Sequence, residues 1–397
     1  MNLWRSIEAM KQSSNIKIFH FHNGAGGGVL SVIRNLLAYR QHPEIENHVI
    51  YTINRNQIPD YKVPGLAGAA SEQVFYYSPK WNFYYTCRQL AKLLPDDKAV
   101  IVAHDWLELG MVSNLGLQNP VVHYVHGAYD YYYSLAVRHS PWVDCYITVA
   151  QHIADELLLR MPGRKENIHY LRFPVPDVKC SVFDKLPGFH LVFAGRCEEA
   201  KGYPLLPEID RALTSRGIRV QWHIAGEGSQ VKAKQAIWPS DSEVQFYGNI
   251  AHDNLMQLLC RSHALILPSQ AEGMPVSVIE AMKASAVPVV NDLPGGIQEL
   301  VLEDVTGFRI SNNRPTLFAD RLAMLIADGH LWQKISSAAS SYASMNFSPE
   351  KNTSQIEDSF LSAYFKNKIK DAQKIYGSRL DHPAIPNMIV KTIRSFL

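Results

Sequence analysis

Two carboxylates, Glu272 and Glu280, stand eight residues apart in the segment PSQAEGMPVSVIEAMKASAVPVVNDLPGG, residues 268–296. Gly273 follows the first of them, and a glycine lets the backbone approach a ligand closely. Pro275 suits the first turn of a helix, and apolar spacing predicts that helix over residues 276–282. The start of a helix presents unbonded N–H groups and a positive dipole end, which suit a phosphate or a sugar hydroxyl. The segment therefore predicts a ligand site with one carboxylate at its mouth and another about two turns further.

Two cations, Arg196 and Lys201, follow a short apolar run at residues 191–194, and a glycine follows Lys201. Cationic donors suit a diphosphate, and an arginine can engage two of its oxygens at once. The plain alternative is a solvated loop that carries two charges. The spacing R-x4-K-G favours the anion site.

A glycine loop, formed by Gly24, Gly26, Gly27 and Gly28, lies between the first predicted strand and the first predicted helix. A loop of this kind can cradle a phosphate. It is not a Walker loop, because no GK[ST] follows, and its GxGxxG register is imperfect. Taken alone, the loop is better explained as a tight strand-to-helix turn.

Histidines mark the ends of two predicted strands. His126 follows the strand at residues 121–125 and could hydrogen-bond a sugar hydroxyl or a phosphate, the alternative being a core or capping histidine. His123 lies on the same face of that strand and is the rival if the register differs. His104 and Asp105 end another strand and either line a ligand site or form a turn. Tyr129 follows soon after His126 and joins them as a candidate for the same site.

Two aromatic groups stand out as well. Tyr129 belongs to the first, with the tyrosines at 131–133, and Trp81, Tyr84 and Tyr85 form the second. Aromatic faces stack on sugars and sit well at lipid interfaces. Ordinary packing is the favoured interpretation for both groups.

Short apolar runs alternate with longer helical patterns, which predicts parallel sheets with crossover helices. The expected strands are residues 16–20, 49–52, 99–103, 121–125, 145–149, 191–194, 220–225, 244–247, 264–267 and 287–290. Residues 173–188 carry three prolines and form the expected linker. The fold class is therefore α/β, with two doubly wound Rossmann-like domains facing across a cleft. The expected domains are residues 1–176 and 177–374, with a C-terminal helix of about 375–397 packing back on the first. Ligands in such sheets bind at the carboxyl ends of the strands.

The formal charge of +2 demands no nucleic-acid partner, and a pI of about 8.2 permits weak attraction to an anionic membrane without requiring it. The five cysteines are scattered and lack CxxC spacing, so we expect reduced thiols in a cytosol rather than zinc or disulfides. The first residues do not form a secretory signal, and no uncharged apolar run is long enough to span a membrane. No D-x-D motif indicates a metal.

Several segments, in this order, resemble the retaining GT-B glycosyltransferases with the E-x7-E signature, also described as glycosyltransferase family 4 or glycosyl transferases group 1. They are NGAGGGVLSVIRNLL (23–37), FAGRCEEAKGYPLL (193–206), WHIAGEGS (222–229), VQFYGNI (244–250), the two-carboxylate run itself, and GGIQELV (295–301) followed by TGF (306–308). Ser285 departs from the family pattern, which has a glycine there, as does the pair Asn291-Asp292, where small residues are common.

The resemblance implies a role for each candidate. Arg196 and Lys201 would grip the donor diphosphate, Glu272 would bind a hydroxyl of the donor sugar, and Glu280 would accept hydrogen bonds from the ribose. His126 would act near the donor sugar, and the acceptor-side candidates are His104, Asp105 and Tyr129. The remaining donor-binding positions are Gly26, Gly27, Gly28, Gly226, Gly248, Asn249, Ile250, Gly273, Met274, Pro275 and Val276, of which Pro275 has no N–H to give.

The expected activity is the transfer of a sugar, with retention, from a nucleotide-diphosphate sugar to a glycan or lipid-linked acceptor in envelope polysaccharide or lipopolysaccharide synthesis. No metal or other cofactor is expected. The expected location is the cytoplasm, with a peripheral contact at the inner face of the membrane as an option. The alternatives are a nucleotide-sugar epimerase on the same fold and a non-catalytic sugar-nucleotide-binding partner protein.

Overall fold

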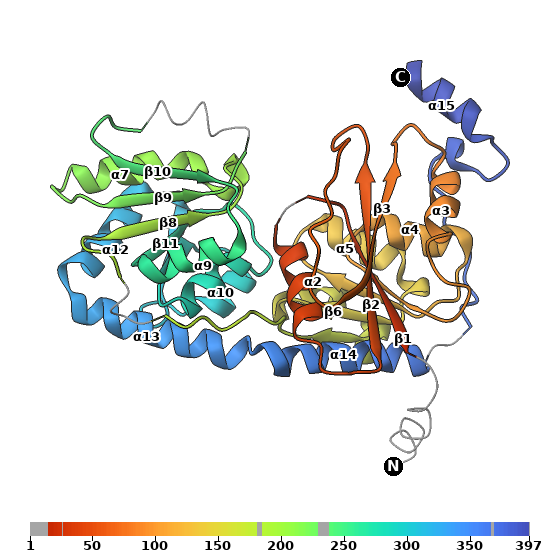
Figure 1. The fold of residues 1–397 in the computed structure, drawn as a ribbon, viewed down its shortest axis with the longest axis horizontal. Helices are drawn as coiled ribbons and strands as arrows, with labels where there is room; N and C mark the ends of the chain where they lie inside the picture. Colours follow the sequence, from red (N-terminus) through yellow and green to blue (C-terminus); the bar gives the residue numbers. More distant parts are fainter. Residues whose placement is uncertain (1–14, 26, 181–184, 229–237, 367–368, 397) are drawn as a thin grey trace, which may run out of the picture. The chain divides into compact units, whose positions relative to one another are not determined.

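The computed structural model describes residues 15–25, 27–180, 185–228, 238–366 and 369–396 (Figure 1). The chain divides into two compact units. The first comprises the residues up to 149, residues 153–173 and those from 350 onward, and the second comprises residues 150–152 and 174–349. The first crossing lies close to the predicted boundary at 176. The chain returns to the first unit at residue 350, however, well before the predicted 375.

The first unit contains a seven-stranded parallel sheet with the order β3-β2-β1-β4-β5-β6-β7. Its strands are β1 (Ile16–His22), β2 (Ile45–Asn54), β3 (Ala69–Tyr77), β4 (Val100–Ala103), β5 (Val121–Val125), β6 (Cys145–Thr148) and β7 (Ile168–Tyr170). Its helices are α2 (Gly28–Ala38), α3 (Phe83–Ala91), α4 (Trp106–Leu115), α5 (Asp130–Arg138), α6 (Gln151–Arg160), α14 (Pro349–Lys366) and α15 (Asn387–Phe396), with short 3₁₀ turns η1 (Ser140–Trp142), η2 (Pro162–Asn167) and η7 (Arg379–Asp381).

The second unit contains a six-stranded parallel sheet with the order β10-β9-β8-β11-β12-β13. Its strands are β8 (His190–Ala194), β9 (Gln221–Ala225), β10 (Glu243–Gly248), β11 (Ala264–Leu267), β12 (Val287–Asn291) and β13 (Phe308–Ile310). Its helices are α7 (Leu206–Thr214), α9 (His252–Arg261), α10 (Val276–Lys283), α11 (Gly296–Leu300), α12 (Pro315–Ala327) and α13 (Gly329–Asn346), with 3₁₀ turns η4 (Glu199–Lys201), η5 (Tyr203–Leu205) and η6 (Ser311–Asn313).

The central strands are short runs of β-branched and apolar residues because both faces of a parallel sheet are covered by helices. Every residue of β4, β5, β8 and β11 is buried. In each sheet the second and third strands are added on one side of the first strand, and the later strands are added on its other side. The strand order therefore reverses between β1 and β4 in the first unit and between β8 and β11 in the second. These reversals are where doubly wound sheets bind ligands.

Helix α14 accounts for the early return of the chain to the first unit. The carboxylate of Glu357 accepts hydrogen bonds from the backbone N–H groups of Gln41 and His42, both at 2.9 Å. Asn352, one turn earlier, donates to the carbonyl of Phe173. These polar contacts, made by buried side chains, hold the helix on the first unit. The predicted boundary is wrong because it assigned this helix to the second unit.

Lys283 ties both ends of the second unit to α10. Its side chain is fully buried, and its Nζ donates to the carbonyl oxygens of Val175 at 2.6 Å and Phe347 at 3.0 Å. It also pairs with the carboxylate of Asp177 at 2.6 Å. A buried charge is tolerated only when it is paired and hydrogen-bonded, so this lysine fixes both crossing segments on the helix.

Cys180 and Cys260 form a disulfide, so the expectation of five reduced cysteines is wrong for this pair. Their Cα atoms are 5.5 Å apart, within the ordinary range for a disulfide. The linker runs beside the end of α9, where the N–H of Leu186 donates to the carbonyl of Arg261. Spacing could not reveal a partner 80 residues away. Because the expected cytosolic location rests partly on reduced thiols, this pair removes part of its support.

Candidate functional site

The loops after β8 and β11 come together at the strand-order reversal of the second unit. Gly202 has φ +71°, and a Cβ there would stand 1.9 Å from the carbonyl oxygen of Pro268, so only a glycine allows this approach. Beside it, the N–H of Gln270 donates to the carbonyl of Ala200 at 3.0 Å. Both contacts draw the residue between them, Lys201, against the end of β11.

Lys201 and Glu272 form an ion pair as a result. The Nζ of Lys201 is 2.6 Å from Oε1 of Glu272, and the carboxylate is buried while the lysine stays partly exposed. Both residues were predicted from their motifs, but their pairing was not. A cation and an acceptor held side by side suit a ligand that carries both a negative charge and a hydroxyl donor.

Arg196 lies on the same loop but is exposed and pairs with the carboxylate of Glu198 at 3.2 Å. The structure therefore does not join Arg196 directly to Lys201 and Glu272. A flexible, exposed arginine at a strand end can still reach an anion that arrives there.

Helix α10 follows the predicted position closely, beginning at Val276 with Pro275 as its N-cap. No side chain caps its start, so the first N–H groups remain open to a ligand. Gly273 also has a close neighbour: a Cβ added at Gly296 would stand 1.8 Å from its carbonyl oxygen. Met274 and Val276 have buried side chains, which leaves only backbone for contact with a ligand.

Glu280 is buried on α10, and its Oε1 accepts a hydrogen bond from Nε2 of His252 at 2.7 Å. His252 begins α9, which packs on α10. Sequence reasoning missed this histidine, because a separation of 28 positions along the chain gives no spacing signal. The imidazole fixes one oxygen of the carboxylate, so the other oxygen is the one available to a ligand.

The ends of β8, β9 and β10 are packed backbone against backbone. Gly226 has φ +142°, its N–H donates to the carbonyl of Gly248 at 2.8 Å, and a Cβ there would stand 1.9 Å from the carbonyl oxygen of Gly195. Next to Gly248, Asn249 donates from Nδ2 to Glu227 at 3.0 Å. Gly226, Gly248, Asn249 and Ile250 thus lie at the carboxyl edge of the same sheet as Lys201 and Glu272.

In the first unit the structure pairs His104 with His126. Nδ1 of His104 is 2.7 Å from Nε2 of His126, so one ring nitrogen donates to the other. Burial lowers the pKa of His126 to about 3, with help from His22, and holds the pKa of His104 well below its usual value. The pair is therefore neutral at pH 7. His126 remains partly exposed at the strand end, whereas the rival His123 is fully enclosed.

Asp105 caps α4, which is the turn that the sequence left open as an alternative to an acceptor role. Its side chain and that of Glu108 form a capping box, and Glu108 accepts from the N–H groups of both His104 and Asp105. Asp105 also accepts hydrogen bonds from the hydroxyl of Tyr131 and from Nδ2 of Asn23. It thereby links the loops after β1 and β4 to α5. Burial, together with Asp105, raises the pKa of Glu108 to about 8.

The glycine loop after β1 is a turn whose backbone is partly satisfied locally. Gly24 has φ +77° and Gly27 has φ +139°, conformations that favour glycine. The N–H of Gly24 donates to the ring of His22, and the N–H of Ala25 donates to the side chain of Asn23. Gly28 begins α2, whose start has no side-chain cap. Gly26 lies outside the described residues. Tyr129 is exposed and immediately precedes α5.

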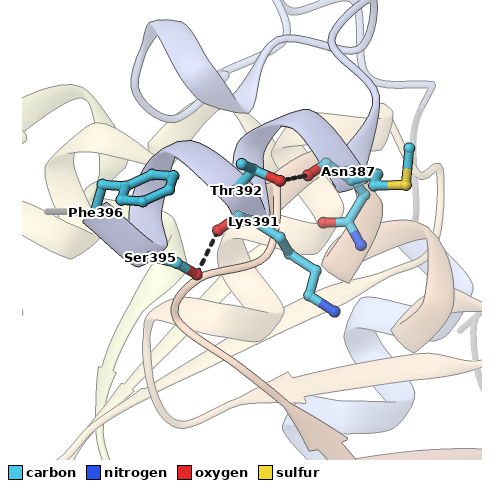
Figure 2. A pocket seen from close by; sticks show the side chains of 6 residues that line it. Asn387, Lys391, Thr392, Ser395 and Phe396 are labelled. Carbon is cyan, nitrogen blue, oxygen red and sulfur yellow. Dashed lines mark hydrogen bonds between the residues drawn. The ribbon is translucent and has the colours of Figure 1, made fainter.

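Three further observations concern metal ions, membrane-spanning helices and a groove outside the predicted site. Within the described ranges, no group of three or more histidine, cysteine, aspartate or glutamate residues could hold a metal ion. No helix in those ranges is both long and apolar enough to cross a membrane. An open groove of about 490 Å³ runs along α15, and none of its lining residues belongs to the predicted site (Figure 2).

The two doubly wound parallel sheets define the GT-B class of fold, as predicted. A solved structure of HepE from Anabaena in complex with UDP-glucose shares this fold with a TM-score of 0.71 at 18% identity, covering 88% of this chain and 100% of that one. The family model for "Glycosyl transferases group 1" matches residues 185–342, and that for "Glycosyltransferase Family 4" matches residues 26–175. Each model matches a different part of the chain, and both describe glycosyltransferases, to which the chain is therefore similar over both of its units.

Among curated relatives, the chain is 29% identical over 142 residues to the putative colanic acid biosynthesis glycosyltransferase WcaL of Escherichia coli, covering 34% of this chain and 35% of that protein. It is also 29% identical over 245 residues to the glycogen synthase of Mycobacterium tuberculosis, covering 52% of this chain and 55% of that protein. The chain thus spans between a third and somewhat more than half of the length of these relatives.

Proposed function

We propose that this protein transfers a sugar, with retention, from a nucleotide-diphosphate sugar to a hydroxyl of a glycan or lipid-linked acceptor. The observation that carries the proposal is the Lys201–Glu272 pair, held at the β8–β11 reversal beside the uncapped start of α10. A cation, open backbone N–H groups and a buried carboxylate match the phosphate and the hydroxyls of one such donor.

The donor's diphosphate would take Lys201 as a partner, with Arg196 closing on it from the exposed loop. Glu272, released from the lysine, would accept a hydrogen bond from a hydroxyl of the sugar. Glu280 would accept from the ribose hydroxyls with the oxygen that His252 leaves open. The backbone N–H groups of Gly273 and its neighbours would complete the binding of sugar and phosphate.

In the transfer step, the bond between the sugar carbon and the diphosphate oxygen breaks, and a bond from that carbon to the acceptor oxygen forms on the same face. The acceptor's proton passes to an oxygen of the departing diphosphate. Lys201 and Arg196 would stabilise the charge that develops there, the role of preorganised donors in many transfer reactions. With two side-chain cations for that charge, we propose that the protein needs no metal ion.

For the first unit we propose that His126 donates or accepts a hydrogen bond with a sugar hydroxyl, in its neutral form. The acceptor would bind to His104, Asp105 and Tyr129. Of these, His104 is hydrogen-bonded to the ring of His126. The hydrogen bonds that Asp105 makes with α4 and with Tyr131 hold its carboxylate in place at this edge of the sheet.

The relatives favour a polysaccharide pathway. The Escherichia coli relative is named for colanic acid biosynthesis, and the Anabaena structure contains UDP-glucose. We therefore propose a uridine-type donor and an acceptor in cell-envelope polysaccharide or lipopolysaccharide assembly. We also propose a cytoplasmic site of action, where nucleotide sugars would reach the site.

A panel of nucleotides and their sugars tests the proposal. UDP, GDP, ADP and CMP, each alone and as a sugar conjugate, would be screened for an upward shift in the melting temperature. A donor at 100 times its dissociation constant adds about 2.7 kcal/mol to the free energy of unfolding. The donor found in this way is expected to release its nucleotide when a glycan acceptor is added, with a new glycosidic product.

Other outcomes would favour the other classes of protein. An epimerase would change the sugar without any acceptor, and a binding protein would retain the donor unchanged through long incubation. Absence of any stabilising nucleotide would contradict the donor site itself.

A further inference from the structure

Helix α15 is held on the first unit by polar contacts. The N–H of Asn82 donates to the side chain of Asn387 at 2.8 Å, and Nδ2 of Asn82 donates to three carbonyl oxygens of the segment before the helix. Arg394, near the other end of α15, pairs with the buried carboxylate of Asp381 at 2.9 Å and donates to the carbonyl of Trp81. Asp381 in turn accepts from the N–H of Phe83 at 2.7 Å. The helix is therefore firmly placed at the start of α3.

The apolar side of α15 points away from this anchor. Val390 is the one residue of the helix that is fully buried. Met388 is 78% exposed, Phe396 is 86% exposed and Ile389 is 49% exposed, and Ile393 is exposed beside them. At about 100° per residue these four side chains fall within one arc of the helix. Nothing in the described part of the chain covers that arc, which leaves a large apolar surface in water.

Exposed positive charge lies on α15 and on the segment around α3 that anchors it. Lys391 lies at the edge of the groove along α15, next to Thr392 and Ser395 (Figure 2). Residues 73–95, which include α3 and the loop that Arg394 contacts, contain three basic residues and no acidic one. Those three, Lys80, Arg88 and Lys92, are exposed. The carboxylate of Asp381 does not offset them, because it is buried and paired with Arg394.

Two aromatic side chains lie beside the helix. Trp81, whose carbonyl accepts from Arg394, packs edge-on against Tyr85 with ring centroids 5.7 Å apart. Tyr85 is exposed. Tryptophan and tyrosine side chains combine an apolar body with a polar tip and favour the boundary between lipid and water.

We propose that the exposed face of α15, together with Trp81 and Tyr85, docks on an anionic lipid surface. An apolar arc edged by cations is the pattern of a helix that lies in the plane of a bilayer, its apolar side chains among the acyl chains and its lysines among the headgroups. A second copy fits less well, since two such faces in contact would bring like charges together. The proposal is independent of the donor site, because no residue of the docking face belongs to it.

Vesicle binding by the full chain tests this proposal. Vesicles of phosphatidylcholine alone and of phosphatidylcholine mixed with phosphatidylglycerol would be compared by co-sedimentation, without donor or acceptor. We expect binding to the anionic vesicles that weakens as salt is added, because salt screens the attraction. The double variant Met388→Ser/Phe396→Ser should bind at least about tenfold more weakly, since it removes two inserted side chains.

Matched control variants distinguish specific binding through this surface from nonspecific hydrophobic or electrostatic binding to vesicles. Leu159, on α6, is 78% exposed and Met345, on α13, is 75% exposed, and Leu159→Ser/Met345→Ser should bind like the wild type. Lys391→Glu should weaken binding about tenfold, whereas Lys334→Glu, at an exposed position on α13, should not. Transfer to a soluble acceptor should be unchanged in all four variants.

Two results would overturn the proposal. One is equal binding of the wild type and the Met388→Ser/Phe396→Ser variant to anionic vesicles, or no binding by either. The other is a dimer in light scattering that this variant abolishes, which would assign the face to a second copy. Loss of sugar transfer with intact vesicle binding would instead count against the proposed function alone.

Discussion

At the scale of single residues, the candidate donor site is held together by contacts between residues far apart in the chain. Lys201 and Glu272 were both named from their motifs, yet their 2.6 Å ion pair depends on a backbone approach at Gly202. His252 was not named, because its contact with Glu280 arises from the packing of α9 on α10. Residue types report what a side chain can do, whereas tertiary packing decides what it faces.

His123 shows how a buried histidine makes stability depend on pH. It lies fully buried in β5, and within the described residues neither ring nitrogen has a hydrogen-bond partner. Burial lowers its pKa to about 3, with smaller contributions from His139 and His126. Between that pKa and its unfolded value near 6.5, the unfolded chain binds a proton that the folded chain does not. The contribution of His123 to stability is therefore complete above pH 6.5 and is lost as the pH falls.

We predict that acidification from pH 7 to pH 5 removes about 2 kcal/mol of stability through His123 alone. The variant His123→Phe has no proton to gain, so its free energy of unfolding should fall less over the same interval by about that amount. His330→Phe, at an exposed position, should follow the wild type. Urea unfolding at the two pH values measures the difference, and identical pH slopes for wild type and His123→Phe would refute the argument.

At the scale of elements, the central strands were predicted closely, as was the edge strand β10, whereas the edge strands β3, β7 and β13 were missed. The bounds of β5 and β11 agree with the sequence-based prediction, and both are continuous buried apolar runs. By contrast, β3 is an edge strand with a mixed polar sequence and partial exposure, and β7 and β13 have three residues each. A strand that covers only an edge needs no continuous apolar run, so its sequence carries little signal.

Gly202, in the loop after β8, allows a second prediction. Both its positive φ and its close approach to Pro268 require a glycine. Gly202→Ala would introduce a Cβ 1.9 Å from the carbonyl oxygen of Pro268 at a φ of +71°. We expect a loss of at least about 2 kcal/mol in the free energy of unfolding, together with weaker donor binding as Lys201 moves from Glu272.

Two other glycines serve as controls for that prediction. Gly217 has a φ of +75° and open space around it, so Gly217→Ala should cost only about 1 kcal/mol. Gly163 has open space and no positive φ, and Gly163→Ala should be nearly neutral. If urea unfolding gave the same loss for Gly202→Ala and Gly217→Ala, the close approach to Pro268 would not matter.

At the scale of the whole molecule, motif order was enough to predict the fold class and the family. The positions at which the chain passes from one unit to the other were harder to predict. The return of α14 to the first unit depends on Glu357, whose partners lie more than 300 residues away in the sequence. The Cys180–Cys260 disulfide likewise joins the linker to the end of α9. Long-range contacts of this kind leave no periodic pattern in a single sequence.

We propose that the protein binds a nucleotide diphosphate at the β8–β11 reversal. Calorimetric titration of UDP, GDP and ADP tests it most directly, with the wild type, Glu272→Gln and Lys201→Ala/Glu272→Gln compared. The double variant leaves no buried carboxylate without a partner, so its fold should persist. At least one of the three nucleotide diphosphates should bind to the wild type and to Glu272→Gln. The same nucleotide should bind to the double variant about tenfold or more weakly, because the charged hydrogen bond from Lys201 is lost. Equal affinity for all three proteins, or no binding to the wild type, would contradict the account.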